Sequence, residues 1–151
     1  MPICTFGVNR MTVKVGLLAT ARKKSNKSAP VTEFYQSPLF QKTLEYASHH
    51  YDRMYFYNAK DGLLLPDDIM DPYDVSIKTF THHQREEWAQ KVIEQFSQYE
   101  TSTDIVVCLH GGSVYRKHLE PQLNHFNYKY EVPLKGLGIG EQLSWYQKNS
   151  V

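Results

Sequence analysis

The sequence predicts an α/β fold: a single three-layer α/β/α domain with a mainly parallel central sheet. Strand-like and helix-like segments alternate along the chain, and parallel neighbouring strands require such helical crossovers. Residues 104–109 form a run of β-branched and apolar residues, as expected for a strand covered on both faces. A chain of 151 residues has the length of one ordinary domain. We therefore expect one domain over residues 1–151, with residues 1–10 forming either an edge strand or a loose arm.

The first half of the chain supplies two predicted strands and one helix. Residues 11–19 are apolar and β-branched and predict a strand, and the polar residues 20–28 predict a loop. A helix is expected to begin at Ser37-Pro38 and run to about Tyr51, because serine is a preferred N-cap and proline is favoured in the first turn. The second strand is predicted over residues 53–57.

The second half continues the alternation. Thr81 and Gln84 have the spacing of a capping box, which predicts the start of a helix that runs to about Tyr99. The strand at 104–109 follows, and a Gly-Gly turn then leads into a helix with Ser113 at its start. The remaining predicted elements are a helix at 114–124, a strand at 128–134 and a helix at 141–148.

Composition excludes several classes of protein. The 17 Lys and Arg residues nearly balance 16 Asp and Glu residues, so no global field favours a polyanion and any nucleic-acid contact must be local. Cys4 and Cys108 are too few and too far apart for a zinc framework. No signal peptide and no apolar run long enough for a membrane span is recognisable. We expect a cytoplasmic protein with no membrane partner, no metal and no cofactor.

The stretch at residues 55–74 organises the rest of the chain. It begins as an aromatic run that predicts a buried strand, and then changes to a predicted polar loop with two prolines and five aspartates. Ligands in open α/β sheets bind outside the carboxyl ends of the strands, where loops of this kind lie. This loop is therefore a candidate site.

Three predicted loops leave the carboxyl ends of strands, at residues 20–24, 58–61 and 110–113. In a parallel sheet these loops meet at one edge, where they combine cations, an amide, a carboxylate, an imidazole and glycine-rich backbone. The combination, with tyrosines as stacking faces, suits a ligand with a flat base, a sugar and a phosphate. The candidate ligand-binding residues are Arg22, Lys23, Tyr35, Ser37, Asn58, Lys60, Tyr73, Gly111, Gly112, Ser113 and Tyr115.

Two residues are candidates for catalysis of N-glycosidic bond cleavage. Asp61 could orient a water molecule or stabilise an oxocarbenium-like transition state, and His110 could stabilise the departing base or give it a proton. The structural alternatives stay open: Asp61 before Gly62 is ordinary turn chemistry, and His110 could satisfy local backbone groups.

The chain resembles the YaaA-like group and its shorter, largely uncharacterised relatives in bacteria and phages. The resemblance covers about residues 12–140 and rests on three segments: Phe-Tyr-Gln-Ser-Pro-Leu-Phe at 34–40, Asn-Ala-Lys-Asp-Gly-Leu-Leu-Leu-Pro at 58–66 with Asp-Pro-Tyr-Asp at 71–74, and His-Gly-Gly-Ser-Val-Tyr at 110–115. It implies a DNA-binding protein of the oxidative-stress response, although this chain lacks a recognisable helix-hairpin-helix insertion. The order of strands and loops is also similar to the uracil-DNA-glycosylase type of sandwich, which implies base excision or nucleoside cleavage.

The resulting hypothesis is recognition of a nucleotide, nucleobase or nucleic acid at the three loops, with or without cleavage of the N-glycosidic bond. The alternative is a non-catalytic protein that associates with DNA under stress or sequesters a nucleotide. A third hypothesis is an interaction domain that binds no small ligand. The sequence leaves the oligomeric state open.

Overall fold

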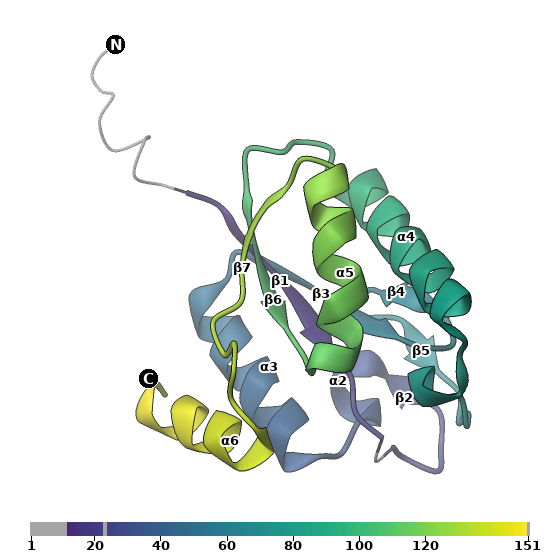
Figure 1. Ribbon diagram of the computed structural model, residues 1–151. Helices are drawn as coiled ribbons and strands as arrows, with labels where there is room; N and C mark the ends of the chain where they lie inside the picture. The colour runs from purple at the N-terminus through teal and green to yellow at the C-terminus, as the bar shows by residue number, and fades with distance from the viewer. Residues whose placement is uncertain (1–11, 23, 151) are drawn as a thin grey trace.

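The computed structural model describes residues 12–22 and 24–150 (Figure 1). Its centre is a five-stranded sheet with the strand order β4-β3-β1-β6-β7. Strands β1, β3, β6 and β7 are parallel, and β4 joins β3 in the antiparallel sense. The predicted α/β class and the mainly parallel sheet are confirmed. The expected strand or arm at residues 1–10 lies outside the described residues.

The elements follow one another along the chain with short connections. The strands are β1 (Lys14–Ala19), β2 (Ala29–Pro30), β3 (Arg53–Asn58), β4 (Gly62–Leu64), β5 (Ile69–Met70), β6 (Val106–His110) and β7 (Lys129–Glu131). The helices are α2 (Val31–Phe34), α3 (Pro38–His50), α4 (His82–Tyr99), α5 (Ser113–His125) and α6 (Ile139–Lys148), with a short 3₁₀ helix, η1 (Ile77–Thr79). Each of the four parallel strands is followed by a long helix, as the sequence predicts.

Alternating side chains of the strands pack against different helices. Val15 and Leu17 of β1 belong to a core cluster that contains the apolar faces of α4 and α5. Leu18 belongs to a second cluster, with Phe40 and Ala47 of α3. Figure 1 shows α4 and α5 in front of the sheet and α3 behind it, and α6 packs against α3. Successive side chains of a strand point to opposite faces of the sheet, and this alternation separates the two core clusters.

Both helix starts predicted from cap residues are confirmed. The Ser37 hydroxyl accepts a hydrogen bond from the Phe40 backbone N–H at the start of α3. Thr81 and Gln84 form the reciprocal capping box of α4. Helix caps can be predicted from the sequence because each of these hydrogen bonds joins residues only three positions apart.

The prediction of a polar loop after residue 57 is wrong in part. Asn58 is the last residue of β3, and Gly62–Leu64 form β4, so the chain makes a β-hairpin here. Gly62 has φ +83°, a conformation that favours glycine and that turns the chain back along β3. β4 has only three residues, which is too short for a sequence period to indicate a strand.

Two other elements differ from their predicted extent. The strand expected at 128–134 is reduced to β7, because the chain reaches Pro133, which cannot donate a hydrogen bond to a strand ladder. Helix α5 begins at Ser113 with Gly112 as its N-cap, one residue earlier than predicted. Ser113 is therefore the first helical residue, and its hydroxyl does not cap the helix.

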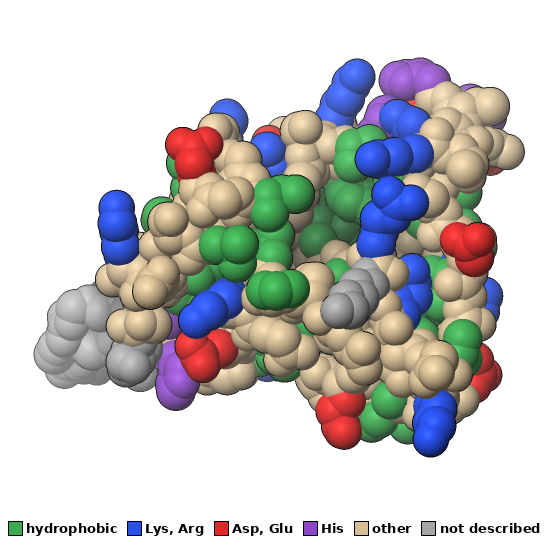
Figure 2. Space-filling view, turned by 90° about the horizontal axis from the view of Figure 1, so that it is seen from below, with side chains coloured by type: hydrophobic (Ala, Val, Ile, Leu, Met, Phe, Trp, Pro, Cys, Tyr) green, Lys and Arg blue, Asp and Glu red, His purple; other side chains and the backbone are tan. Residues whose placement is uncertain are grey.

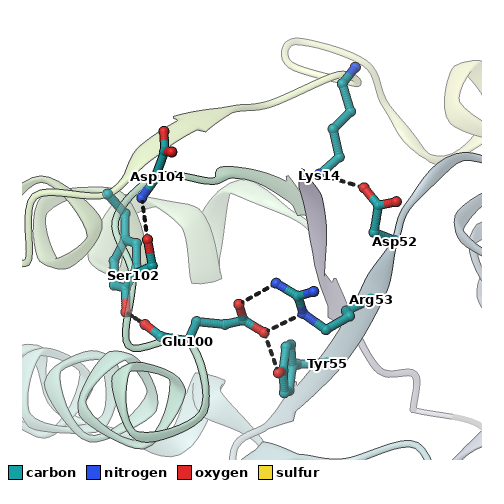
Figure 3. A network of polar contacts seen from close by, with 8 residues as sticks. Lys14, Asp52, Arg53, Tyr55, Glu100, Ser102 and Asp104 are labelled. Atoms are coloured by element: carbon teal, nitrogen blue, oxygen red, sulfur yellow. Dashed lines mark hydrogen bonds and ion pairs between the residues drawn. The ribbon is translucent and has the colours of Figure 1, made fainter. Parts of the chain in front are cut away.

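A polar network lies where β3 begins and α4 ends, away from the carboxyl ends of the strands (Figure 3). The Glu100 carboxylate, only 5% exposed, accepts hydrogen bonds from the Arg53 guanidinium, with both nitrogen–oxygen distances at 2.8 Å. The Tyr55 hydroxyl donates to the same carboxylate, and the Tyr128 hydroxyl donates to the Glu100 carbonyl. This network joins three segments that are distant in the sequence.

Candidate functional site

The strand order creates a crevice between β1 and β6. The chain passes from β1 to β3 on one side of β1, and later returns to β6 on the other side. Such a reversal is the place where open α/β sheets bind ligands, outside the carboxyl ends of the strands. A cavity of about 180 Å³ lies there, with walls from both strands and from α3, α5 and α6. The lining residues are Ala19, Thr20, Ser37, Leu39, Phe40, Thr43, His110, Gly111, Gly112, Tyr115, Ile139, Gln142 and Tyr146.

Three helices begin at this cavity. Ser37 precedes α3, Gly112 precedes α5, and Ile139 is the first residue of α6, and all three residues line the cavity. The N-cap of α5 is a glycine without a side-chain hydrogen bond, so no side chain satisfies the N–H groups of its first turn there. Helix starts carry partial positive charge and free N–H groups, which stabilise an anionic group.

His110, at the end of β6, is held between two tyrosines. Its Nε2 atom lies 2.5 Å from the Tyr51 hydroxyl and its Nδ1 atom lies 2.6 Å from the Tyr146 hydroxyl. The side chain is 3% exposed, and burial lowers the pKa of His110 from 6.5 to about 4. The imidazole is therefore neutral at pH 7, and both of its nitrogens already have partners.

The low pKa of His110 makes the fold sensitive to acid. Below pH 6.5 the unfolded chain binds a proton at this residue while the folded chain does not, so stability falls as pH decreases from 6.5 to about 4. We expect a loss of about 2–3 kcal/mol over this window, measured by urea unfolding at successive pH values. Replacement of His110 by Gln should reduce the slope, whereas replacement of the exposed His125 should not. Equal slopes in all three proteins would contradict this account.

A second polar cluster adjoins the cavity. The Asn58 amide nitrogen lies 3.1 Å from Asp61 Oδ2, 3.3 Å from the Tyr35 hydroxyl and 3.2 Å from the Tyr73 hydroxyl. The two tyrosine hydroxyls are 2.6 Å apart, and burial raises the pKa of both. Thr20 connects the cavity that it lines to the strand that carries this cluster, because its hydroxyl donates to the Tyr57 carbonyl at 2.9 Å, one residue before Asn58.

Cationic side chains lie beside the cluster. The Lys24 ammonium is 4.7 Å from the centre of the Tyr73 ring, and that of Lys60 is 5.6 Å from it. Burial raises the pKa of Tyr115, and the positive charge of the exposed Arg22 nearby opposes this rise. Figure 2 looks onto this edge of the sheet from below and shows Lys and Arg side chains gathered beside a hollow in the surface.

One comparison with known proteins decides the family. A family model described as a family of unknown function (DUF6884) matches residues 15–148. The chain belongs to DUF6884. The matched range contains all the elements that line the cavity. Neither a curated protein nor a solved structure matches the chain.

The predicted site residues of this DUF6884 chain fall into two adjoining groups. Five of them line the cavity: Ser37, His110, Gly111, Gly112 and Tyr115. Four form the second cluster: Tyr35, Asn58, Asp61 and Tyr73. The loops that the sequence expects at one edge of the sheet therefore do meet there.

Other predicted residues lie apart from the cavity. Asp61 and Lys60 line a separate open hollow beside β4 and β5, so the two candidate catalytic residues, Asp61 and His110, do not face one cavity. Ser113 lines an outer groove between α4 and α5. Lys23 lies outside the described residues.

Tyr35 has a different role from the one predicted for it. The sequence offers its ring as a stacking face, but the side chain is 0% exposed and its ring packs against Phe34 and Phe40. Tyr35 therefore contributes only its hydroxyl to the cluster. Tyr115 is partly exposed and lines the cavity, so its ring remains available to a ligand.

The sequence did not reveal the tyrosines that hold His110. Tyr51 follows α3 and Tyr146 lies in α6, far from β6 along the chain. One signal was present: Gly16 stands in the middle of β1, where a glycine marks close approach of another group. A Cβ atom at Gly16 would lie 2.7 Å from the Tyr51 ring.

The site residues constrain the possible chemistry. The cavity-facing groups are neutral hydroxyls, an amide, a neutral imidazole and backbone N–H groups. Cys108, behind His110, is buried, and burial raises the pKa of its thiol to about 12, so it is not a thiolate at neutral pH.

Within residues 12–22 and 24–150, no helix combines the length and apolar character of a membrane span.

Proposed function

We propose that this protein binds a nucleobase-containing ligand, a nucleotide, nucleobase or nucleic acid, in the cavity between β1 and β6. The observation that carries this proposal is the position of the cavity at the reversal of strand order, with three helix starts around it. The free N–H groups at α5 suit a phosphate or another anionic group. The partly exposed ring of Tyr115 supplies an aromatic face for a flat base, and the buried rings of Phe40 and Tyr146 line the cavity beside it.

The size of the cavity limits how much of the ligand enters it. Its volume of about 180 Å³ is below the range of roughly 300–1,000 Å³ that is usual for pockets holding drug-sized ligands. One base or one sugar phosphate therefore enters, and the rest of a larger ligand lies over the rim. We propose that this outer part meets the cationic side chains beside the adjoining cluster, Arg22, Lys24 and Lys60.

Cleavage of an N-glycosidic bond is the second candidate function. The Asp61 carboxylate is the candidate group for it, because Asn58 holds Oδ2 at 3.1 Å in the cluster that adjoins the cavity. Binding without chemistry, by a stress-associated DNA-binding protein or one that sequesters a nucleotide, is favoured instead by His110, whose two nitrogens are both occupied.

Three further assignments belong to the same proposal. We propose that the chain is a short relative of the YaaA-like group, and that its sheet and helices form a three-layer α/β/α sandwich of the type found in uracil-DNA glycosylases. The packing of α3 and α4 on side chains from opposite faces of β1 supports this arrangement. A cytoplasmic location is also part of the proposal, supported by the free, buried thiol of Cys108.

Native mass spectrometry of the purified protein tests binding directly. We expect a retained nucleotide or base, or, after its removal, binding of adenine, AMP or a short single-stranded oligonucleotide measured by calorimetry. Replacement of Tyr115 by Ala should weaken binding about tenfold or more, because loss of one stacking contact costs about 1–3 kcal/mol. No retained ligand and no binding of any of the three probes at millimolar concentration would overturn the proposal.

Release of a base from nucleosides and oligonucleotides tests the cleavage hypothesis. If cleavage occurs, D61N and H110A should each abolish base release while the unfolding transition stays cooperative. Matched controls are D104N and H125A, two exposed positions away from the cavity lining, which should release base at the wild-type rate. Unchanged base release in D61N and H110A would remove these residues from catalysis.

A further inference from the structure

A groove on the outer side of α5 carries cationic side chains that the proposed function does not use. Figure 1 shows α4 and α5 side by side, and the groove lies between the first turn of α4 and the first two turns of α5. Three of its lining residues are cations and one is a carboxylate, so a ligand there meets a net positive charge. The lining residues are Arg85, Ser113, Val114, Arg116, Lys117 and Glu120.

Both arginines of this groove are fixed by hydrogen bonds. The Arg85 guanidinium donates to two carbonyls of η1, at 3.2 and 3.3 Å. The Arg116 guanidinium donates to the Gly111 carbonyl at 3.0 Å and to the Glu120 carboxylate at 3.2 Å. A guanidinium has five N–H groups, so each arginine can also donate to an anion. Among the described residues, no carboxylate pairs with Arg85 or Lys117.

His118 is a buried polar side chain beside the groove. It lies one turn after a groove residue, is 6% exposed, and its ring centre is 5.3 Å from that of His82 in α4. No hydrogen bond joins its ring to another described residue, and every fully enclosed side-chain nitrogen in that part of the chain has a partner, so its ring nitrogens reach the surface. Burial lowers the pKa of His118, and the charges of Lys117 and Arg85 lower it further against the opposing charge of Glu86. A bound anion would offset this positive charge and could pair with the imidazole.

The first turn of α5 forms the wall between the groove and the cavity. Gly112 and Tyr115 line the cavity, whereas Ser113 and Arg116 line the groove. The two spaces therefore lie about one helix diameter apart, roughly 10 Å. A nucleotide whose base enters the cavity keeps its own phosphate near the cavity mouth. A phosphate on the other side of the helix belongs to a neighbouring nucleotide.

We propose that the groove binds the phosphate backbone of a single-stranded nucleic acid, one of whose bases enters the cavity between β1 and β6. Arg85 and Lys117 supply positive charge for one phosphate, and Arg116 connects that contact to the cavity through the Gly111 carbonyl. The strand is single because a base enclosed in a cavity cannot remain paired and stacked in a duplex. Occupation of the cavity by a base rests on the proposed function, whereas binding of a strand in the groove does not.

Fluorescence anisotropy of a labelled single-stranded DNA of about ten nucleotides tests the groove, because such a length covers a typical single-strand site. We expect this DNA to bind about tenfold or more tightly than AMP, with an affinity that falls as salt concentration rises. K117A, at an exposed position, should weaken DNA binding. It should also reduce the slope of log affinity against log salt concentration by about 0.7, the contribution of one phosphate contact on a single strand.

Two further variants separate the phosphate contact from a general effect of charge. K117R keeps the cation and should keep the wild-type slope. K129A removes an exposed lysine at the first residue of β7, at the other end of the sheet, and should also keep it. A slope that is equal in K117A and K129A, or DNA that binds no more tightly than AMP, would overturn the inference and leave the proposed function standing.

Replacement of Tyr115 by Ala distinguishes the groove from the cavity. Y115A should weaken binding of both AMP and the DNA, because both place a base in the cavity that Tyr115 lines. DNA binding that K117A weakens and Y115A leaves unchanged would count against the proposed function, and the phosphate contact in the groove would stand.

Discussion

Replacement of Gly111 by alanine should destabilise the fold by about 4 kcal/mol. Gly111 has φ +150°, which side chains of L-residues rarely adopt, and a Cβ atom there would overlap the Tyr57 hydroxyl. That hydroxyl donates to the His110 carbonyl at 2.8 Å, so the substitution would also displace the end of β6. Urea unfolding would measure the loss, and ligand binding should fall with it because Gly111 lines the cavity.

The neighbouring glycine provides the control. Gly112 has φ −72°, and a Cβ atom there would have no other atom within 4 Å. We expect G112A to change the free energy of unfolding by no more than about 1 kcal/mol, the usual cost of alanine at an N-cap. Equal stability of G111A and G112A would show that the fold does not depend on the close contact between Gly111 and Tyr57.

Replacement of Glu100 by alanine should cost about 3–4 kcal/mol. Burial by itself raises the pKa of Glu100, but hydrogen bonds from Arg53 and Tyr55 outweigh it and hold the pKa below 4.5. The variant leaves the buried Tyr55 hydroxyl without its acceptor, whereas Arg53, whose side chain is 48% exposed, can return to water. The largest part of the expected loss therefore comes from Tyr55.

Two comparisons sharpen this prediction. Y55F/E100A should be more stable than E100A alone, because the orphaned hydroxyl has been removed. E94A, at an exposed position of α4, should change stability by less than about 0.5 kcal/mol. A loss in E100A as small as that in E94A would show that the network in Figure 3 contributes nothing to stability.

The sequence predicts well those parts of the fold that are formed by interactions between residues close together in the chain. The caps at Ser37 and Thr81 are formed by bonds three residues apart, and the run at 104–109 is apolar because both of its faces are covered. β4 was missed because three buried residues show no period, and its place was set by the turn at Gly62 and by pairing with β3.

In the candidate site, too, some features follow from the local sequence and others only from the packing of distant segments. By itself, the sequence determined that polar and glycine-rich residues follow the strands, so Asn58, Asp61 and His110 could be named as site residues. Only the tertiary structure decided that Asp61 and His110 face different hollows, and that Tyr51 and Tyr146 occupy both nitrogens of His110. Helices α3 and α6 bring these tyrosines to β6, and no local pattern records a contact between residues that meet only when the sheet and helices pack.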